Sequence, residues 1–307
     1  MPPFFKYAVV GSGAVGSYYG AKLAHGARRE VHFLMRGDLE TVKRDGLTVR
    51  SKDGDFHMAK VNAHRSTQEI GPCDVVIIAL KTTANNVLAE VLPPLLHQNT
   101  VLLTLQNGLG NEEVLAEHFG AERVLGGLCF VCLNRVAHGV IDHFGHGTLS
   151  IGEFHGPPQT RTARIVQDFR DGGIDAHAVQ NLITERWRKL VWNIPFNGLG
   201  IAARANTEEV LRDENLHTLA KNLMRETIDA ANRLGHKIPS GFAQEQIERS
   251  WPMGAYRSSS QIDFELGHEV EVESIWGEPY RQAAHAGAEV PRLEMLYALI
   301  KKLAAKP

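Results

Sequence analysis

Cysteine is scarce in this sequence of 307 residues, which holds only Cys73, Cys129 and Cys132. Three cysteines are too few to form a disulfide framework in a chain of this size. We therefore expect a reduced, cytoplasmic protein. Cys129 and Cys132 form a C-x-x-C motif, but "GGLCFVCL" is typical of a strand, in which residues at this spacing point to opposite faces. No second pair of ligands accompanies them, so we expect neither a redox pair nor a metal site.

Long hydrophobic runs and an excess of one charge are also missing. The longest apolar run, "VVIIAL", is too short to span a bilayer, and the first residues lack the pattern of a secretory signal. The 33 Lys and Arg residues nearly balance the 35 Asp and Glu residues, without any long basic block. We therefore expect neither nucleic acid nor a membrane as a partner.

The composition, 43% hydrophobic and 22% charged, is that of a globular chain long enough for two domains. From about residue 4 to residue 180, short apolar runs alternate with segments of helical periodicity, which predicts a parallel sheet with helices on both faces. The later segments are long and helical. The predicted fold is α/β, with a Rossmann-type parallel-sheet domain over 1–180 and an all-helical domain over 181–307. The predicted strands are "YAVVG", "VHFLM", "DVVIIAL", "VLLTLQ" and "RVLGGLCFVCL".

Two further segments of the first domain alternate apolar and polar residues. We expect "GLTVRSKDGDFHMAKV" and "GVIDHFGHGTLSIGEF" to be antiparallel hairpins added to the sheet. The second holds His143 and His146 in a glycine-rich turn, where surface or loop histidines are expected.

The segment "VVGSGAVG" places Gly11, Gly13 and Gly16 in a G-x-G-x-x-G motif between a predicted strand and a predicted helix. In that context the glycines permit a tight turn, a close approach to a pyrophosphate and close packing of helix against strand. The helix N-terminus then offers amide groups to the anion. We predict that this loop binds a dinucleotide through Gly11, Ser12, Gly13, Ala14, Val15 and Gly16.

The end of the second predicted strand, "FLMRGD", bears on the choice of cofactor. An NAD site would hold an acidic residue there, whereas Arg36 would pair with the 2′-phosphate of NADP. NADP is therefore favoured. Asp38 is the alternative, because a small shift of the loop would bring its carboxylate to the ribose.

Two polar residues follow other predicted strands, Lys81 after "DVVIIAL" and Asn107 in "TLQNG". Ligands of such sheets bind beyond the carboxyl ends of the strands, so both residues are candidates for cofactor or substrate contacts. Taken alone, each could equally be a loop cation or a turn asparagine.

The segment "RKLVWNIPFN" carries a polar stripe on an otherwise apolar helix. Lys189, Asn193 and Asn197 are spaced four apart and would lie on one face, which predicts the wall of a cleft. The alternative is a solvent-facing edge of the helix. Pro195 removes a backbone donor and could kink or end the helix before Asn197.

In chain order, "GSGAVG", "LMR", "LKT", "QNG", "ERWRKLVWN", "SSSQIDFELG" and "EVESIWG" resemble the ketopantoate reductase family (2-dehydropantoate 2-reductases) over nearly the whole chain. The W-R-K-L-x-x-N segment and the S-S-x-x-x-D…E-x-[DE]-x-I-x-G segment are the most specific to this family. The resemblance implies an enzyme of pantothenate biosynthesis that reduces a 2-keto acid with NADPH between a Rossmann domain and a helical domain. A homodimer is possible.

The resemblance also assigns roles to individual residues. It implies that Lys189 is the catalytic lysine and that Glu271 is the conserved carboxylate, with cofactor contacts as well. It implies that substrate is bound by Asn193, Asn197, Ser259 and Asn107, and that cofactor is also bound by Arg36, Lys81 and Asn107. A further substrate-binding position falls on Asn206 or Thr207.

In the implied reaction NADPH delivers hydride to the 2-keto carbon, and Lys189 donates a proton to the developing alkoxide. Lysine is protonated near neutral pH because its usual pKa is about 10.4. Two departures from the family pattern, Val270 beside Glu271 and Gly198 after Asn197, leave the identity of the keto acid open. The alternatives are a related hydroxy acid dehydrogenase and a non-catalytic NADP sensor, which would not need a proton donor.

Overall fold

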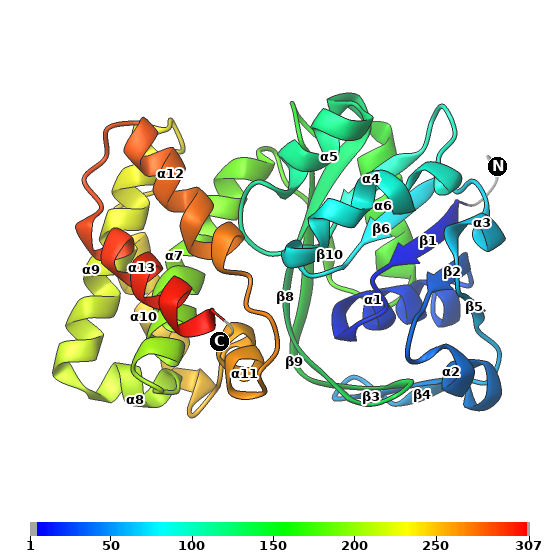
Figure 1. Cartoon of the computed structure of the whole chain (residues 1–307), viewed down its shortest axis with the longest axis horizontal. Coiled ribbons are helices and arrows are strands. Elements are labelled where there is room, and N and C mark those ends of the chain that lie inside the picture. Colours follow the sequence, from blue (N-terminus) through cyan, green and yellow to red (C-terminus); the bar gives the residue numbers. More distant parts are fainter. Residues whose placement is uncertain (1–4, 306–307) are drawn as a thin grey trace. The chain divides into compact units, whose positions relative to one another are not determined.

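The computed structural model describes residues 5–305, which divide into two compact units (Figure 1). Unit 1 contains residues 5–106 and 111–182, and unit 2 contains residues 107–110 and 183–305. The short segment 107–110 therefore packs with unit 2, although the chain on either side of it belongs to unit 1. None of the helices described between residues 5 and 305 is long and apolar enough to cross a membrane.

Unit 1 is built on one sheet, which has ten strands among the described residues. Its strand order is β4-β3-β9-β8-β7-β6-β1-β2-β5, with β10 paired to β9. All neighbours from β8 to β5 in this order are parallel, whereas β8–β9 and β3–β4 are antiparallel. The strands are β1 Lys6–Val10, β2 Glu30–Leu34, β3 Leu47–Ser51, β4 Phe56–Met58, β5 Asn62–His64, β6 Val75–Ile78, β7 Val101–Thr104, β8 Val124–Ala137, β9 Val140–Glu153 and β10 Ala176–Ala178.

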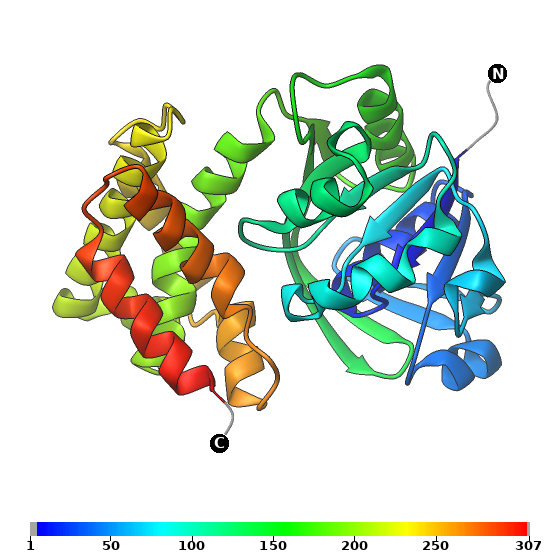
Figure 2. The same ribbon diagram turned by 45° about the horizontal axis from the view of Figure 1, so that its top comes forward.

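Alternate residues of the central strands enter two separate apolar cores. Tyr7 and Val9 of β1 belong to one core, and Ala8 and Val10 belong to the other. Successive side chains of a strand point to opposite faces, so a strand covered on both sides must be apolar throughout. The first core includes side chains from α1 and α6, and the second includes side chains from α4 and α5. Figure 2 shows the ribbon of the sheet and the helices of unit 1 in a second view. The helical segments of unit 1 are α1 Ala14–His25, α2 Leu39–Asp45, α3 Thr67–Ile70, η1 Thr82–Val87, α4 Leu88–Val91, η2 Pro93–Leu95, α5 Asn111–Phe119, η3 Ala121–Arg123 and α6 Thr160–Asp171.

The predicted fold class is confirmed, and so is the first of the two predicted hairpins, which forms β3 and β4. The second segment is also an antiparallel addition, as predicted, but it does not turn back on itself: it forms the single long strand β9, which pairs with β8. Its glycine-rich part does not turn the chain, and irregular pairing with β8 accommodates it instead.

The expectation of a surface position is also wrong for His143, which is buried. Its Nδ1 lies 2.8 Å from Ser51 Oγ and its Nε2 lies 3.0 Å from the carbonyl oxygen of His146. Burial lowers the pKa of His143. The glycines that suggested a loop here sit within a strand, where a histidine with hydrogen-bond partners can be buried.

Unit 2 is helical. Its segments are α7 Leu182–Ala202, α8 Thr207–Arg212, α9 Glu214–Arg233, α10 Phe242–Ser250, η4 Trp251–Met253, α11 Ser259–Glu265, the π-helix η5 Glu273–Gly277, α12 Glu278–His285 and α13 Pro291–Ala304. Apolar residues of α7 are buried, among them Trp187 and Ile194. The indole Nε1 of the buried Trp276 donates to the Ile194 carbonyl at 3.0 Å, which ties η5 to α7.

Pro195 does not end α7, which continues to Ala202. Of the two outcomes considered for Pro195, a kink or an end, the end of the helix before Asn197 therefore does not occur. Proline lacks the backbone N–H that would have bonded to the Val191 carbonyl, but the surrounding side chains are packed in the core of unit 2. Burial of the helix on several sides stabilises it more than the missing hydrogen bond weakens it.

Candidate active site

The three glycines of the loop in unit 1 have different surroundings. Gly11 has φ +104°, and a Cβ there would overlap the backbone of Ala79 and Leu80. A Cβ at Gly16 would overlap the carbonyl oxygen of Gly11. At Gly13, by contrast, a Cβ would meet no atom within 4 Å. Packing of the protein therefore requires the first and third glycines, whereas the second leaves open the space that a phosphate group would use.

The loop borders a pocket of about 250 Å³ that lies wholly in unit 1. Its lining includes Gly11, Ser12, Gly13, Arg36, Lys81 and Arg135. Ser12 Oγ donates to the Leu34 carbonyl at 2.8 Å and so holds the loop to β2. Ala14, Val15 and Gly16 form the first turn of α1, which has no acidic residue. A helix N-terminus without acidic side chains, next to three cations, fits a dinucleotide pyrophosphate.

Asp38, the alternative residue for contacting the cofactor, already has two partners within unit 1. Its carboxylate is buried, with 7% of the side chain exposed, and accepts from Arg135 Nη1 at 3.0 Å and 3.1 Å. His138 Nδ1 lies 2.5 Å from the same carboxylate. Arg36 is exposed and lines the pocket. Asp38 is thus engaged within unit 1, whereas the side chain of Arg36 is exposed at the pocket.

Sequence reasoning missed Arg135 as a residue of this pocket. It lies 97 positions beyond Asp38 in the chain, near the end of β8. No local pattern around "LNRVAHG" points to the dinucleotide loop. The arginine reaches the pocket only in the folded sheet, near the end of the long strand β8.

Lys81 and Asn107 follow neighbouring strands of the sheet but lie in different units. Lys81 lines the dinucleotide pocket, whereas Asn107 begins the segment that packs with unit 2. Lys189 Nζ of α7 donates to Asn107 Oδ1 at 2.7 Å. The predicted catalytic lysine and one predicted asparagine, 82 positions apart, are therefore brought together.

Asn193 and Asn197 continue the stripe of Lys189 along α7. Asn193 is 9% exposed and Asn197 is 2% exposed. Asn197 Nδ2 donates to the Asn193 carbonyl at 2.9 Å, and Asn197 Oδ1 accepts from the Ser260 backbone N–H at 3.3 Å. The two asparagines are thus buried and Lys189 is partly buried, so the stripe is not a solvent-facing edge. Asn197 links α7 to the start of α11.

The three serines at the start of α11 differ in their surroundings. Ser258 is the N-cap, and its Oγ accepts from the Gln261 backbone N–H at 3.4 Å. Ser260 is buried, whereas Ser259 is exposed. The exposed hydroxyl of Ser259 is the one assigned from the family resemblance, and its role stays a prediction.

Asn206 and Thr207, the two positions for a further substrate contact, both have structural partners in unit 2. Asn206 caps α8, with its Oδ1 accepting from the Glu209 backbone N–H at 3.0 Å. Thr207 Oγ1 donates to the Tyr256 carbonyl at 3.0 Å. These contacts explain both residues without a ligand.

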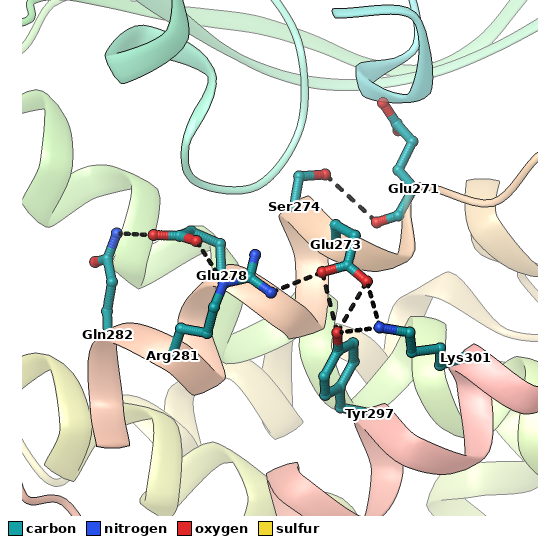
Figure 3. A network of polar contacts seen from close by, with 8 residues as sticks. All are labelled: Glu271, Glu273, Ser274, Glu278, Arg281, Gln282, Tyr297 and Lys301. Carbon is teal, nitrogen blue, oxygen red and sulfur yellow. Dashed lines mark hydrogen bonds and ion pairs between the residues drawn. The ribbon is translucent and has the colours of Figure 1, made fainter. Parts of the chain in front are cut away.

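Glu271 and Glu273 stand two positions apart but have different surroundings, as Figure 3 shows. Glu273 accepts from Arg281 Nη1 at 2.7 Å and from Tyr297 Oη at 2.8 Å, and it lies 3.2 Å from Lys301 Nζ. Burial alone would raise the pKa of Glu273, but the hydrogen bonds from these partners lower it. Glu273 therefore joins η5 to α12 and α13, which fits a structural role.

Glu271 lies just before η5, and its carbonyl oxygen accepts from Ser274 Oγ at 3.4 Å (Figure 3). The π-helix that follows is a conformation often found at functional sites. Its carbonyl at Ser274 also accepts from the Leu109 backbone N–H at 2.9 Å. The η5 region thus holds the segment that carries Asn107.

Gly108 should be the most sensitive residue of that segment. It has φ +83°, and a Cβ there would overlap the backbone carbonyl of Ser274. We expect Gly108→Ala to lower the free energy of unfolding by about 2 to 4 kcal/mol. Gly235→Ala is the matched control, because Gly235 has φ +92° with no atom near its Cβ position, and should cost about 1 kcal/mol. Urea unfolding measures both, and equal losses would contradict the role given to the Ser274 contact.

The chain is similar to ketopantoate reductases over both units. Residues 7–156 match the family described as "Ketopantoate reductase PanE/ApbA", and residues 181–304 match "Ketopantoate reductase PanE/ApbA C terminal". A 2-dehydropantoate 2-reductase of Nostoc sp. is 42% identical over 97% of this chain and 95% of its own length.

Solved structures agree with these matches. The crystal structure of a 2-dehydropantoate 2-reductase from Geobacter metallireducens has a TM-score of 0.94 and 41% identity, over 97% of this chain and 99% of that one. A D-mandelate dehydrogenase with NADH and anilino(oxo)acetate shares the fold, with a TM-score of 0.88 and 20% identity over 97% of this chain and 98% of that one.

Proposed function

The chain belongs to the ketopantoate reductase family, and we propose that it reduces 2-dehydropantoate to pantoate with NADPH while Lys189 supplies the proton. As a member of this family it is an oxidoreductase that acts on a small keto acid with a nicotinamide cofactor. We place it in the cytoplasm, as expected from its sequence.

The observation that carries the proposal is the hydrogen bond from Lys189 to Asn107. An ammonium group donates to the amide oxygen at 2.7 Å, so the lysine is held at one position on α7. A positioned general acid next to a reacting carbonyl speeds proton transfer by about 10²- to 10⁴-fold. Lys189 would give its proton to the oxygen of the 2-keto group and recover one from solvent after the product leaves.

The residues of the unit 1 pocket fit the cofactor. When bound, the dihydronicotinamide supplies a hydride to the 2-keto carbon. The amide groups of the Gly11–Gly16 loop would hold the pyrophosphate, and Arg36 would hold the 2′-phosphate. Lys81 adds a second positive charge to the same pocket. The exposed Arg36 and the engaged Asp38 support NADPH over NADH.

The remaining residues would position the substrate. Asn193 and Ser259 offer an amide and a hydroxyl that can hydrogen-bond to a carboxylate or a hydroxyl group. Asn197 would act by holding α11 to α7, since its amide is engaged with Asn193 and Ser260. Glu271 would balance the charge of Lys189 and orient it. Such positioning reduces the entropy that the reaction must lose.

Initial rates of NADPH oxidation with a panel of 2-keto acids test the proposal. The panel contains 2-dehydropantoate, pyruvate, 3-methyl-2-oxobutanoate and phenylglyoxylate. We expect kcat/KM to be at least about 10-fold higher for 2-dehydropantoate, because hydrogen-bonding sites discriminate strongly between substrates. A higher value for another acid would overturn the substrate, and no turnover with any of them would favour an NADP sensor.

A further inference from the structure

The hairpin formed by β8 and β9 reaches the dinucleotide pocket of unit 1. Arg135 lies near the end of β8, and His138 lies in the turn before β9. Arg135 lines the pocket together with Arg36 and Lys81. The pocket is therefore lined by a cation from the hairpin, Arg135, as well as by Arg36 after β2 and Lys81 after β6.

Asp38 holds Arg135 in this place. Its carboxylate has 7% of its surface exposed and accepts from Arg135 Nη1 through both oxygens, at 3.0 Å and 3.1 Å. A buried carboxylate is stable only when it is paired and hydrogen-bonded, so the ion pair is expected to persist. His138 Nδ1 lies 2.5 Å from Oδ1 of the same carboxylate.

Much of the guanidinium of Arg135 remains available to a ligand. Its hydrogen bonds within residues 5–305 use Nη1, and the side chain is 47% exposed. An arginine has five N–H donors in a rigid planar fork, which suits phosphate oxygens. An arginine whose Nη1 is already held by a carboxylate loses less conformational entropy on binding a phosphate group than an arginine that moves freely.

We propose that Arg135 is a second phosphate-binding residue, which holds the 2′-phosphate of NADPH together with Arg36. The inference rests on the proposed use of NADPH and goes beyond it, because it assigns cofactor selectivity to the hairpin. Asp38, the acidic residue that could have served an NAD site, instead positions the arginine that selects the 2′-phosphate. The Asp38–Arg135 pair thus offers a cation to the 2′-phosphate of NADPH. It also engages the carboxylate that could have accepted a hydrogen bond from the ribose of NADH.

Binding of two cofactor fragments to the whole protein tests this inference without catalysis. Isothermal titration calorimetry gives the Kd for adenosine 2′,5′-bisphosphate and for adenosine 5′-monophosphate, which differ by the 2′-phosphate. We expect Arg135→Ala to weaken the bisphosphate by about 10-fold and the monophosphate by less than about twofold, as fits the loss of one charge-assisted contact. Arg135→Lys should recover part of the loss.

Arg50→Ala is the matched control. Arg50 is also a partly exposed arginine beside an aspartate, 3.8 Å from Asp142, but it lies outside the pocket lining. It should leave both Kd values unchanged. If Arg135→Ala does not fold because Asp38 is left without its partner, the double variant Asp38→Asn/Arg135→Ala removes the buried charge and should show the same selective loss.

The outcomes separate this inference from the proposed function. If wild type prefers the bisphosphate and Arg36→Ala loses that preference, but Arg135→Ala behaves like Arg50→Ala, the inference is overturned and the use of NADPH stands. If wild type binds both fragments equally well, the use of NADPH fails, and the inference fails with it. A selective loss in Arg135→Ala supports the inference.

Discussion

Replacement of Lys189 by alanine should lower kcat for 2-dehydropantoate by about 10²- to 10⁴-fold, the range expected for a general acid. The Kd for NADPH should stay within about twofold of wild type, because the pocket residues that fit the cofactor belong to unit 1. Steady-state rates and fluorescence titration with NADPH measure the two quantities. Retained turnover would remove Lys189 from the mechanism.

Two controls separate chemistry from folding in this experiment. Lys237→Ala removes an exposed lysine of unit 2 and should leave kcat unchanged. Thermal unfolding of Lys189→Ala should resemble that of wild type, because Lys189 is only partly buried. If the melting temperature fell strongly along with kcat, the lysine would be a structural residue.

Replacement of Arg36 by alanine should weaken NADPH binding by about 10- to 100-fold, which corresponds to about 1.5 to 3 kcal/mol for a hydrogen bond to a charged group. NADH lacks the 2′-phosphate, so its Kd should change by less than about twofold. The ratio of the two Kd values is the informative quantity, since a general loss of affinity cancels in it.

Arg65→Ala is the control for this change. Arg65 is an exposed arginine of unit 1 whose Nη2 donates to Glu40 at 2.7 Å, and it lies outside the pocket lining. It should bind both cofactors like wild type. An equal loss of NADPH and NADH affinity in Arg36→Ala would show that the guanidinium supports the structure of the pocket and does not bind the 2′-phosphate.

The parts of the fold that follow local periodicity could be predicted from the sequence. The apolar runs of β1, β6 and β7 have to be apolar on both faces, and close backbone contacts require glycine at Gly11 and Gly16 of the loop. The spacing of Lys189, Asn193 and Asn197 placed them on one face of α7, because residues four apart lie on the same face of a helix.

The errors arose where tertiary packing outweighs local preference. Glycines around His143 suggested a turn, but pairing with β8 extends the segment into one strand. Pro195 could have kinked or ended the helix before Asn197, but α7, with its buried faces, continues to Ala202. In both cases the decisive contacts come from distant segments, which local patterns do not record.

Site contacts between distant positions were the least predictable. The pairing of Asp38 with Arg135 depends on the strand order of the whole sheet, and that of Lys189 with Asn107 depends on a short segment packing with the other unit. The family resemblance supplied roles for Lys189 and Asn107. It supplied none for Arg135, which the structure alone brings to the pocket.

The transfer of hydride to the 2-keto carbon is tested most directly with NADPH that carries deuterium at its transferable C4 position. The wild-type protein, 2-dehydropantoate and the labelled cofactor are incubated together, and the product is analysed by NMR and mass spectrometry. We predict pantoate with deuterium at C2, in equal amount to the NADPH oxidised. Oxidation of NADPH without deuterated pantoate, or no oxidation at all, would contradict it.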